Sequence, residues 1–354
     1  MIEPHKIKRV VVRTPNWVGD VVMCVPALRA LRRLLPQARI TLVSRPGAAD
    51  IFADAGCADE VIIHQRSGLL SAWKQAGEWK QHRFDLAILF QNAFEAAAIA
   101  FMARVPARIG YDTERRGFLL THPITTPAWK NDRHEVFYYL NIIGELEQAL
   151  SGVTSLETIE PDFALLISEG RKREAHEFLR QHGIDKERPL VLLCPGSVNS
   201  RAKRWPSERY AALSDHFVES GASVALIGSP GEKEVSEKVC AQARHDPVIL
   251  TGKTSVAEVT GLISVADLLV TNDTGPAHIG AAVGTPTIVL FGPTDPVTTR
   301  PFGAAGIVIR HPPDCAPCML RDCPIDHRCM TAITPAEVFE KGVAMMRVRL
   351  EVTA

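Results

Sequence analysis

The sequence has no net charge, because 40 Lys and Arg residues are balanced by 40 Asp and Glu residues among its 354 residues. A neutral chain lacks the electrostatic attraction that general nucleic-acid binding requires, so we expect no nucleic-acid partner. The distribution is uneven, since residues 1–150 carry 19 basic and 15 acidic side chains and the remaining residues carry 21 and 25. This asymmetry is either ordinary scatter or a sign that the N-terminal half meets an anionic partner.

The sequence also has no predicted secretory leader or membrane span. Its first residues, MIEPHKIKRVVVRT, carry charges where the apolar core of a leader would lie. The best apolar run, AAAIAFMA at residues 96–103, is far shorter than the ~20 residues of a membrane helix. We therefore expect a cytoplasmic protein that at most touches a membrane surface. In that reducing compartment the eight cysteines do not predict disulfides.

Two common nucleotide-binding motifs are missing as well. No G-x-G-x-x-G follows the first predicted strand, and no G-x-x-x-x-G-K-[ST] occurs anywhere. These absences argue against a dinucleotide fingerprint and against a P-loop.

What the sequence does contain is two series of apolar runs that alternate with segments of helical periodicity. The runs are rich in Val, Ile and Leu, as expected of strands buried on both faces of a parallel sheet. The segments between them have apolar residues three and four apart, as amphipathic helices do. The predicted strands lie at residues 9–14, 38–44, 60–64 and 85–90, and then at 189–196, 222–229, 247–252, 267–273 and 285–293.

A polar segment at residues 151–163, which ends in the sequence EPDF, separates the two series and is typical of a linker. We therefore predict an α/β fold with two Rossmann-like, doubly wound domains, residues 1–163 and residues 164–354. Ligands of such sheets bind beyond the carboxyl ends of the strands. The natural site of this protein is then a cleft in which the two domains face each other.

The first predicted strand leads into a helix through the sequence VVRTPNWVGDVVMCVPALRAL, with Asp20 at the junction. A carboxylate in the first turn of a helix is favoured by the helix dipole, which is one explanation for it. The other is a catalytic base, because His64, His82 and His122 have no acidic partner nearby in the sequence. The N-terminal domain offers few other bases.

In the C-terminal domain, Asp273, Thr274, Gly275 and Pro276 follow a predicted strand and open a helix. Proline near the first turn costs no helical hydrogen bond, and glycine lets a ligand approach the backbone. The N–H groups at such a helix end suit a phosphate or diphosphate. The alternative is an Asp or Thr cap on an ordinary helix.

Two further patches follow strands in the same domain. Ser197 and Lys203 lie in a loop that could neutralise a diphosphate or could be an ordinary solvated basic loop, and Ser207 is expected to cap the next helix. Glu232 begins a later helix. Its carboxylate could accept hydrogen bonds from ribose hydroxyls, or simply favour the helix N-terminus.

Three of these segments, NWVGDVVMCVPALRAL, CPGSVNSRAKRWP and NDTGPAHIGAA, together resemble the ADP-heptose:lipopolysaccharide heptosyltransferases of glycosyltransferase family 9. The resemblance covers roughly residues 8–300 and is greatest to the heptosyltransferase II subgroup. Residues 89–124 also resemble the acceptor-side region of that subgroup. Three motifs in the right order are far more specific than any one alone.

The resemblance implies a GT-B fold, with the acceptor bound by the first domain and an ADP-sugar by the second. It implies inverting transfer of heptose from ADP-L-glycero-D-manno-heptose, without a cofactor or a catalytic metal. Asp20 matches the general base of the family, and Lys203 would assist departure of the diphosphate. The donor-binding residues that it implies are Ser197, Lys203, Glu232, Asp273, Thr274, Gly275 and His278.

The implied acceptor, heptosyl-Kdo2-lipid A in the lipopolysaccharide inner core, is anionic and suits the basic N-terminal half. It also suggests a protein that is peripheral at the inner face of the inner membrane. Arg115 and Arg116 are our candidates for contacts to its charges. Two other activities stay open: transfer to another core acceptor (Kdo or a later heptose), and a nucleotide-sugar epimerase of the same architecture. A binding module without activity is disfavoured by the presence of Asp20 and Lys203.

One feature lies outside the resemblance. The segment CAPCMLRDCPIDHRCM carries Cys315, Cys318, Cys323 and Cys329, with His327 nearby. A C-x2-C pair followed by two more cysteines is typical of structural zinc sites. A redox cluster and a loop of reduced thiols are the alternatives. None of these possibilities assigns the cysteines a part in the transfer chemistry.

Overall fold

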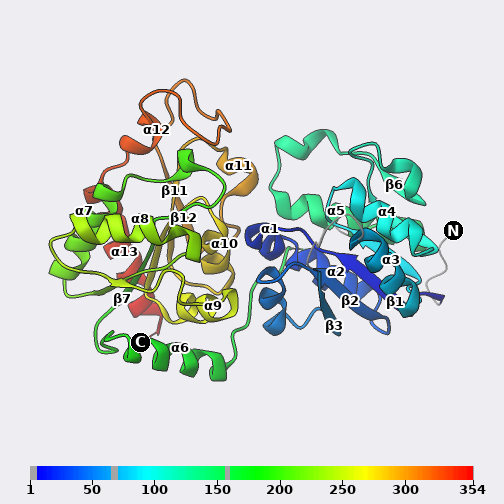
Figure 1. Ribbon diagram of the computed structural model, residues 1–354, viewed down its shortest axis with the longest axis horizontal. Helices are drawn as coiled ribbons and strands as arrows, with labels where there is room; N and C mark the ends of the chain where they lie inside the picture. Colours follow the sequence, from blue (N-terminus) through cyan, green and yellow to red (C-terminus); the bar gives the residue numbers. More distant parts are fainter. Residues whose placement is uncertain (1–5, 65–70, 156–159, 354) are drawn as a thin grey trace. The chain divides into compact units, whose positions relative to one another are not determined.

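The computed structural model describes residues 6–64, 71–155 and 160–353, with no side chains described for residues 53–54 and 348–353. The chain divides into two compact units, Met1–Phe163 and Ala164–Ala354. Each unit is a parallel sheet with helices on its faces (Figure 1). None of the helices in the described ranges is both long enough and apolar enough to cross a bilayer.

The sheet of unit 1 has six parallel strands in the order β3-β2-β1-β4-β5-β6. The strand order reverses between β1 and β4, which is where a doubly wound sheet opens a crevice at its carboxyl edge. The four strands predicted from the sequence are present, and β5 and β6 are two further strands that the sequence analysis does not predict. The strands are β1 (Arg9–Arg13), β2 (Arg39–Ser44), β3 (Glu60–Ile63), β4 (Leu86–Leu89), β5 (Ala107–Tyr111) and β6 (His122–Ile124).

The helices of unit 1 cover both faces of this sheet. On one face α3 and α4 pack together over Val11, Val43 and Leu89. Val10 and Val12 point to the other face, where α2 packs against α5. The helical segments are α1 (Val18–Met23), α2 (Val25–Leu34), α3 (Ser71–His82), α4 (Phe94–Met102) and α5 (Glu135–Ser151), with 3-10 turns η2 (Ala48–Asp54), η3 (Gly117–Leu119) and η4 (Ala128–Asn131).

The predicted helix after β1 is in fact two helices, because Pro26 lacks the N–H that a continuous helix would use. The first ends at Met23, and the second begins at Val25 with Pro26 in its first turn, where proline is tolerated. The break leaves the short α1, with Asp20 in its first turn, at the carboxyl end of β1. At the end of the unit, α5 stops at a left-handed Gly152, and residues 156–159 of the expected linker lie outside the described residues.

The sheet of unit 2 also has six parallel strands, in the order β12-β11-β10-β7-β8-β9. Its order reverses between β10 and β7, so their carboxyl ends are adjacent. All five predicted strands are present, and β12 is an additional edge strand. The strands are β7 (Leu190–Cys194), β8 (Ser223–Leu226), β9 (Val248–Ile249), β10 (Leu268–Asn272), β11 (Thr287–Phe291) and β12 (Gly306–Arg310).

The helices of unit 2 form two packed groups. One joins α7, α8 and α13, and the other joins α6, α9 and α10 (Figure 1). Phe339 of α13 packs edge-on against Phe217 of α7 at 5.1 Å between ring centroids. The helical segments are α6 (Glu169–Gln181), α7 (Ser207–Glu219), α8 (Lys233–Gln242), α9 (Val256–Val265), α10 (Gly275–Ala282), α11 (Pro296–Thr299), α12 (Arg328–Thr331) and α13 (Pro335–Thr353), with 3-10 turns η6 (Arg201–Lys203) and η7 (Pro230–Glu232).

The helix ends show one prediction confirmed and one wrong. Gly183 follows α6 with a φ of 78°, the left-handed conformation expected just past a helix end. Ser207, expected to cap α7, is instead its first residue. Pro206 occupies the N-cap position, and no side chain caps this helix there.

Candidate active site

The carboxyl edge of the unit 2 sheet holds an ion pair between Lys203 and Asp273. Lys203 Nζ donates to Asp273 Oδ2 at 2.7 Å and to the Asp273 carbonyl at 3.3 Å. Thr294 Oγ1 donates to the same Oδ2 at 2.8 Å. Asp273 is only 6% exposed, so these two donors offset the cost of burying its charge. Thr294, which follows β11, had not been identified from the sequence.

Lys203 can still bind an anion while it is paired with Asp273. Its side chain is 26% exposed, whereas that of Asp273 is 6% exposed. An ammonium has three N–H donors, and Asp273 accepts from at most two of them. The third can reach a phosphate oxygen while the pair with Asp273 holds the lysine in place.

Asn272, the last residue of β10, fixes the backbone around this pair. Its fully buried amide donates to the carbonyls of Pro195 and Gly196 at 2.9 and 3.0 Å. Its oxygen accepts from Trp205 N at 3.1 Å and from the Tyr210 hydroxyl at 3.2 Å. One side chain therefore ties the loop after β7 to the segment that follows Lys203.

The loop after β7 carries Ser197, which is almost completely buried. The Ser197 carbonyl accepts from Arg204 Nε and Nη2 at 3.1 and 2.8 Å. The loop is therefore held from both sides, by Asn272 and by Arg204. Ser197 lies on this fixed loop, which follows the carboxyl end of β7.

Glu232 is positioned by its own turn and by a glycine. Its Oε2 accepts from the amide and the hydroxyl of Ser229, both at 2.7 Å, which closes a capping box. A Cβ on Gly196 would lie 2.0 Å from Glu232 Oε1, so only glycine fits beneath this carboxylate. Both interpretations of Glu232 from the sequence, as a helix N-terminal residue and as a ribose-binding carboxylate, therefore stay open. Its Oε2 stabilises a turn, and its Oε1 lies beside the loop that follows β7.

The N-terminus of α10 lacks the side-chain cap considered for Asp273 or Thr274. Thr274 occupies the N-cap position without a capping hydrogen bond, and its hydroxyl is 3.1 Å from that of Thr271. Asp273 is paired with Lys203 instead. Gly275 begins the helix, and His278 lies one turn into it and is 6% exposed. This helix end, uncapped by Thr274, therefore lies beside the Lys203–Asp273 pair, as an anion site would require.

Asp20 belongs to unit 1, whereas the donor-side residues predicted from the sequence belong to unit 2. It lies in the first turn of α1 and is partly exposed. Burial raises the pKa of Tyr139 well above its usual value, and the negative charge of Asp20 raises it further. The helix that carries Asp20 packs against α5 and follows the carboxyl end of β1, which pairs with β4.

The two arginines expected to contact the acceptor differ sharply. Arg115 is exposed and has a left-handed φ of 58°. Arg116 is fully buried, and its guanidinium donates to Tyr111 O at 2.8 Å, to Asn92 Oδ1 at 3.2 Å and to Gln91 O. Burial lowers the pKa of Arg116 to about 10. Its donors bind the loop after β4, so its burial argues against the contact with acceptor that we expected.

Sequence reasoning missed another pair of arginines at the same edge of unit 1. Arg13 ends β1, is 5% exposed and donates from Nη1 to Val43 O at 3.1 Å. Arg45 follows β2 and is exposed. Burial lowers the pKa of Arg13 to about 10, and the nearby charge of Arg45 contributes. Their positions in the sequence could have identified them, because Arg13 ends a predicted strand and Arg45 follows one, and ligands bind at the carboxyl ends of such strands.

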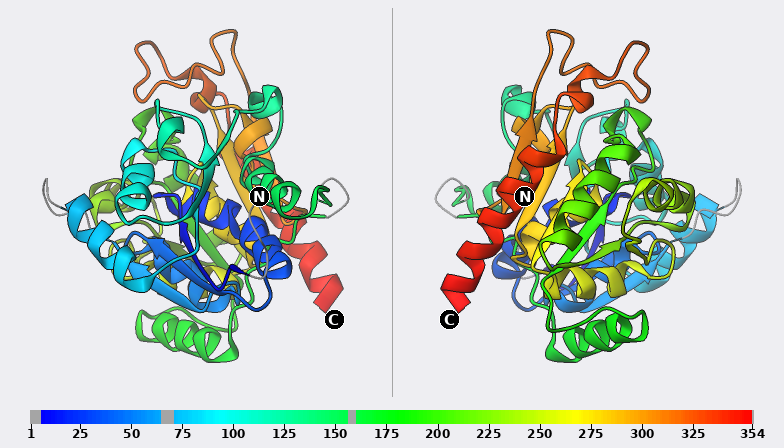
Figure 2. Two further views of the ribbon diagram at one scale, coloured as in Figure 1. Left: turned by 90° about the vertical axis from the view of Figure 1, so that its right-hand side faces the viewer. Right: turned by 90° about the vertical axis from the view of Figure 1, so that its left-hand side faces the viewer.

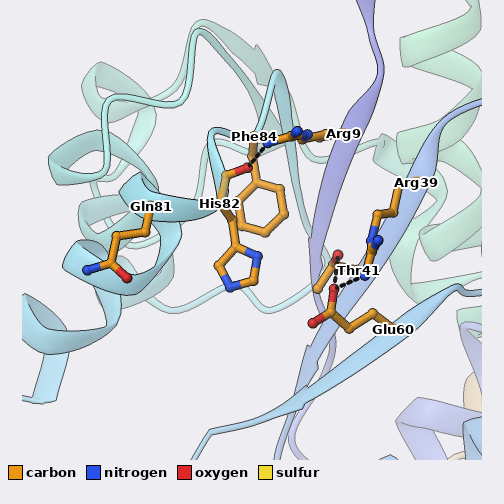
Figure 3. Close-up of a pocket in the computed structure, with 7 residues that line it drawn as sticks. All are labelled: Arg9, Arg39, Thr41, Glu60, Gln81, His82 and Phe84. Atoms are coloured by element: carbon orange, nitrogen blue, oxygen red, sulfur yellow. Dashed lines mark hydrogen bonds and ion pairs between the residues drawn. The ribbon is translucent and has the colours of Figure 1, made fainter.

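A pocket of about 360 Å³ lies at the opposite, amino-terminal edge of the unit 1 sheet (Figure 3). Its polar groups bond to one another: Arg9 Nη1 donates to His82 O at 3.0 Å, and Arg39 pairs with Glu60 at 3.1 Å. His82 stacks on Phe84. His82 therefore supports the fold at this edge and is remote from Asp20.

No metal centre is preformed in the ranges that the structure describes. Within them, no group of three or more His, Cys, Asp or Glu side chains is arranged to hold a metal ion.

Two doubly wound units, one with an ion pair beside a helix N-terminus at its carboxyl edge and one with a carboxylate and arginines there, form the architecture of the GT-B class. A sequence profile of glycosyltransferase family 9 (heptosyltransferase) matches residues 73–328. The chain belongs to this family and is a glycosyltransferase.

Individual relatives agree with the family assignment. Lipooligosaccharide heptosyltransferase 2 of Haemophilus influenzae is 29% identical over 304 residues, which are 84% of this chain and 86% of the relative. Lipopolysaccharide heptosyltransferase 2 of Escherichia coli is 28% identical over 314 residues, 85% and 88% of the two chains. The solved structure of E. coli ADP-heptose lipopolysaccharide heptosyltransferase II is 26% identical, with a TM-score of 0.83 over 98% of this chain and 100% of that chain. The predicted GT-B fold is thus confirmed.

Proposed function

We propose that this protein is an inverting heptosyltransferase of lipopolysaccharide inner-core synthesis. Its donor is ADP-L-glycero-D-manno-heptose and its acceptor is heptosyl-Kdo2-lipid A. The family assignment and relatives named heptosyltransferase 2 support this activity over most of the chain. The single observation that carries it is the Lys203–Asp273 pair beside the N-terminus of α10, because a diphosphate leaving group needs such a site.

The donor side uses charge and helix dipole to accept the leaving group. The diphosphate lies at the start of α10, near Thr274 and Gly275, and Lys203 donates its third N–H to a phosphate oxygen. As the bond between the anomeric carbon and the diphosphate oxygen breaks, negative charge grows on ADP. A lysine already held by Asp273 meets that charge without reorganising, which lowers the barrier.

The base is Asp20. Its carboxylate accepts the proton of an acceptor hydroxyl while that oxygen forms the new bond to the anomeric carbon from the face opposite the diphosphate. The electron pair of the broken bond leaves with ADP, and the configuration of the anomeric carbon inverts. The location of Asp20 in the first turn of α1, partly exposed at a carboxyl edge, supports this role.

On the donor side, Ser197, Glu232 and His278 complete the binding site. Glu232 Oε1 is the group that can accept from a ribose hydroxyl, since Oε2 is occupied by Ser229. On the acceptor side, Arg115 and Arg45 are both exposed and can meet phosphate or carboxylate groups of the lipid core. Arg116 contributes indirectly, because its guanidinium binds backbone carbonyls and so holds the loop after β4 in place.

We also propose that the protein is cytoplasmic and binds the inner face of the inner membrane through unit 1. Three exposed aromatic side chains, Phe94, Phe101 and Phe118, support this contact and are called the aromatic patch below. Phe94 and Phe101 lie two turns apart on α4, and the Phe94 and Phe118 rings are 6.3 Å apart. Arg108 lies over Phe101 at 5.5 Å, and Arg104 and Arg115 are exposed nearby in the chain. Aromatic rings with flanking arginines suit an anionic lipid surface.

The decisive experiment is incubation of the purified protein with ADP-heptose, with and without heptosyl-Kdo2-lipid A, followed by mass spectrometry. Heptose transfer predicts that the acceptor gains the mass of one heptose and that ADP appears only when the acceptor is present. An epimerase would change the sugar nucleotide without any acceptor. Parallel reactions with Kdo2-lipid A and with a core that already carries two heptoses test the remaining alternative acceptors. Relatives named for other core heptosyltransferases, at 25–26% identity, make this comparison necessary.

A further inference from the structure

The connection between β12 and α12 is long for a segment without regular structure. Its residues 311–327 form no helix or strand. Connections of this length are uncommon in compact domains unless they have a function. Figures 1 and 2 show it projecting from unit 2 as two adjoining lobes. The transfer chemistry by itself does not require such a segment.

The turn that carries Lys203 is bonded to this connection through the residue before the lysine. Ala202 is buried, and both of its backbone polar groups have partners in the connection. Its N–H donates to Arg321 O at 2.9 Å. Its carbonyl lies 2.6 Å from His327 Nε2 and accepts a hydrogen bond from it. The peptide groups on either side of Ala202, including the one that it shares with Lys203, are therefore held from outside the turn.

The geometry of His327 serves this contact and not its own helix. The residue occupies the N-cap position of α12, where a side chain commonly accepts from the helix N–H groups, but its imidazole makes no capping bond. Its φ of 57° is the left-handed conformation, which is costly for a residue other than glycine. Such strain persists only where the surrounding structure enforces it. The imidazole instead reaches Ala202, which is 125 residues away in the sequence.

The helix that His327 begins is anchored in the core of unit 2. Met330 of α12 is completely buried in a hydrophobic cluster of that unit. A Cβ on Gly292 would lie 2.4 Å from Met330 Sδ, so α12 packs directly against the backbone that follows β11. An imidazole at the start of an anchored helix can hold a turn in place, whereas an exposed ion pair such as Arg201–Asp322 contributes little.

We propose that His327 is a positioning residue for Lys203. Its Nε2 donates to the Ala202 carbonyl, and this bond sets the direction of the backbone from which the lysine reaches Asp273 and the diphosphate of ADP. Nε2 carries a proton in this arrangement, because a carbonyl oxygen only accepts. A lysine on a fixed backbone loses less conformational freedom when it binds a phosphate, so the bond should raise the affinity for ADP. This role rests on the proposed function of Lys203 in binding the donor.

Two substitutions separate the hydrogen bond from the backbone strain. His327→Ala removes the donor, whereas His327→Gln keeps an N–H donor on a side chain of similar reach. Neither alanine nor glutamine favours left-handed backbone, so the strain should be similar in the two variants. His311→Ala is the matched control, since His311 lies in the same connection but pairs with Glu337 at 2.8 Å.

Affinity for ADP, measured by calorimetry, is the readout of positioning. We expect the Kd for ADP to rise by about threefold to tenfold in His327→Ala, the effect of losing one hydrogen bond. His327→Gln should recover most of the affinity, and His311→Ala should keep all of it. Equal weakening in His327→Ala and His327→Gln would overturn the donor role of the imidazole.

The variant Lys203→Ala shows which proposal fails if the result is negative. Unchanged ADP affinity in His327→Ala, together with weaker binding in Lys203→Ala, would overturn the positioning role of His327 alone. Unchanged affinity in Lys203→Ala would overturn the proposed function of the lysine, and the role of His327 in ADP binding with it.

Amide hydrogen exchange tests the coupling to the turn without ADP or transferase activity, so its result does not depend on the proposed function. In His327→Ala the amides of Ala202 and Lys203 should exchange about threefold to tenfold faster. The Leu250 amide, which donates to Leu226 O in the same unit, is the internal control. Unchanged protection of Ala202 and Lys203 would disprove the coupling. Equally faster exchange of all three amides would disprove it too, because it would mean that unit 2 as a whole is destabilised.

Discussion

The proposed transfer depends on two charged side chains that face different demands. Lys203 must be held in place beside a carboxylate that is almost buried, and the 2.7 Å contact with Asp273 achieves this. Asp20 must be accessible to an acceptor hydroxyl, and its partial exposure in a short helix allows this. Each residue therefore makes a separate prediction.

Replacing Asp20 with Asn should remove the base and little else, because the amide keeps the shape of the carboxylate. We expect turnover to fall by ~10²–10⁴-fold, the usual contribution of a positioned general base. Initial rates with ADP-heptose and acceptor measure this, and calorimetry should show unchanged affinity for ADP. Asp132→Asn, an exposed carboxylate elsewhere in unit 1, is the matched control. Near-normal turnover in Asp20→Asn would exclude the base role.

Replacing Lys203 with Ala should have two separable effects. The carboxylate of Asp273 loses its charged partner and keeps only Thr294, so we expect unit 2 to lose about 1–3 kcal/mol of stability by chemical denaturation. Affinity for ADP should fall as well, because a charge-assisted contact to phosphate is lost. Lys238→Ala removes an equally short but exposed ion pair and should change neither.

The double variant Lys203→Ala, Asp273→Asn separates these effects. Neutralising Asp273 should restore much of the stability without restoring affinity for ADP. If ADP binds to Lys203→Ala as tightly as to the unchanged protein, Lys203 serves the fold alone.

At the scale of elements, the sequence predicted the central strands of both sheets well. Strands such as β1 and β7 are continuous apolar runs with buried side chains on both faces, which leaves little ambiguity. Strands β5, β6 and β12 were missed because they include Arg108, Pro123 or Gly306 and owe their structure to a neighbouring strand. Pairing across a sheet edge overrides local propensity, and no local pattern reveals it.

The candidate site could be predicted only in part, because the sequence shows which residues follow strands but does not show which of these residues meet. The rule that ligands bind at carboxyl ends placed Lys203 and Asp273 at one edge of a sheet. Their mutual ion pair spans 70 residues of sequence and could not be predicted, and neither could the burial of Arg116. The contacts of Thr294 and Asn272 could not be predicted either, because their partners, the Asp273 carboxylate and the carbonyls of Pro195 and Gly196, are brought close only by folding.

The loop after β7 makes a prediction about Gly196. A methyl group there would lie 2.0 Å from Glu232 Oε1, so Gly196→Ala must displace either Glu232 or the loop. We expect unit 2 to lose about 1–3 kcal/mol of stability, as overpacked positions do, together with weaker binding of ADP. Gly231→Ala is the matched control, since nothing lies within 4 Å of a Cβ there. Equal stability of the two variants, measured by thermal unfolding, would show that the carboxylate moves aside freely.

At the scale of the whole molecule, the proposed donor and acceptor residues belong to different units. Lys203 and Asp273 lie in unit 2, and Asp20 lies in unit 1. Neither unit alone can place both substrates, and placing them is a large part of the barrier to such a transfer.

This division predicts closure on binding. The radius of gyration from X-ray scattering should fall when a donor analogue and the acceptor are both bound, because closure excludes water that would hydrolyse the activated sugar. Donor analogue alone is the control and should have a smaller effect. An unchanged radius, with both sites shown to be occupied, would mean that no closure takes place.

The aromatic patch predicts a specific loss of membrane binding. Phe94→Ser with Phe118→Ser should reduce sedimentation with vesicles containing anionic lipid and should slow transfer to acceptor held in such vesicles. Transfer to a soluble, delipidated acceptor should be unaffected. Leu166→Ser, an equally exposed apolar residue in unit 2, is the control. If vesicle sedimentation and transfer to vesicle-held acceptor are both unchanged in the double variant, the patch has no part in membrane contact.

The position of α13 has a consequence for how the chain folds during its synthesis. This helix covers Phe217 and Leu268 so closely that a Cβ on Gly342 would lie 2.8 Å from Leu268, so the core of unit 2 stays incomplete until α13 has been made. Unit 1 is a continuous stretch that ends at Phe163. At ~5–20 residues per second, the ribosome needs about 10–40 s for residues 164–354, which gives unit 1 time to fold first. The membrane contact proposed for the aromatic patch can therefore form while unit 2 is still being translated.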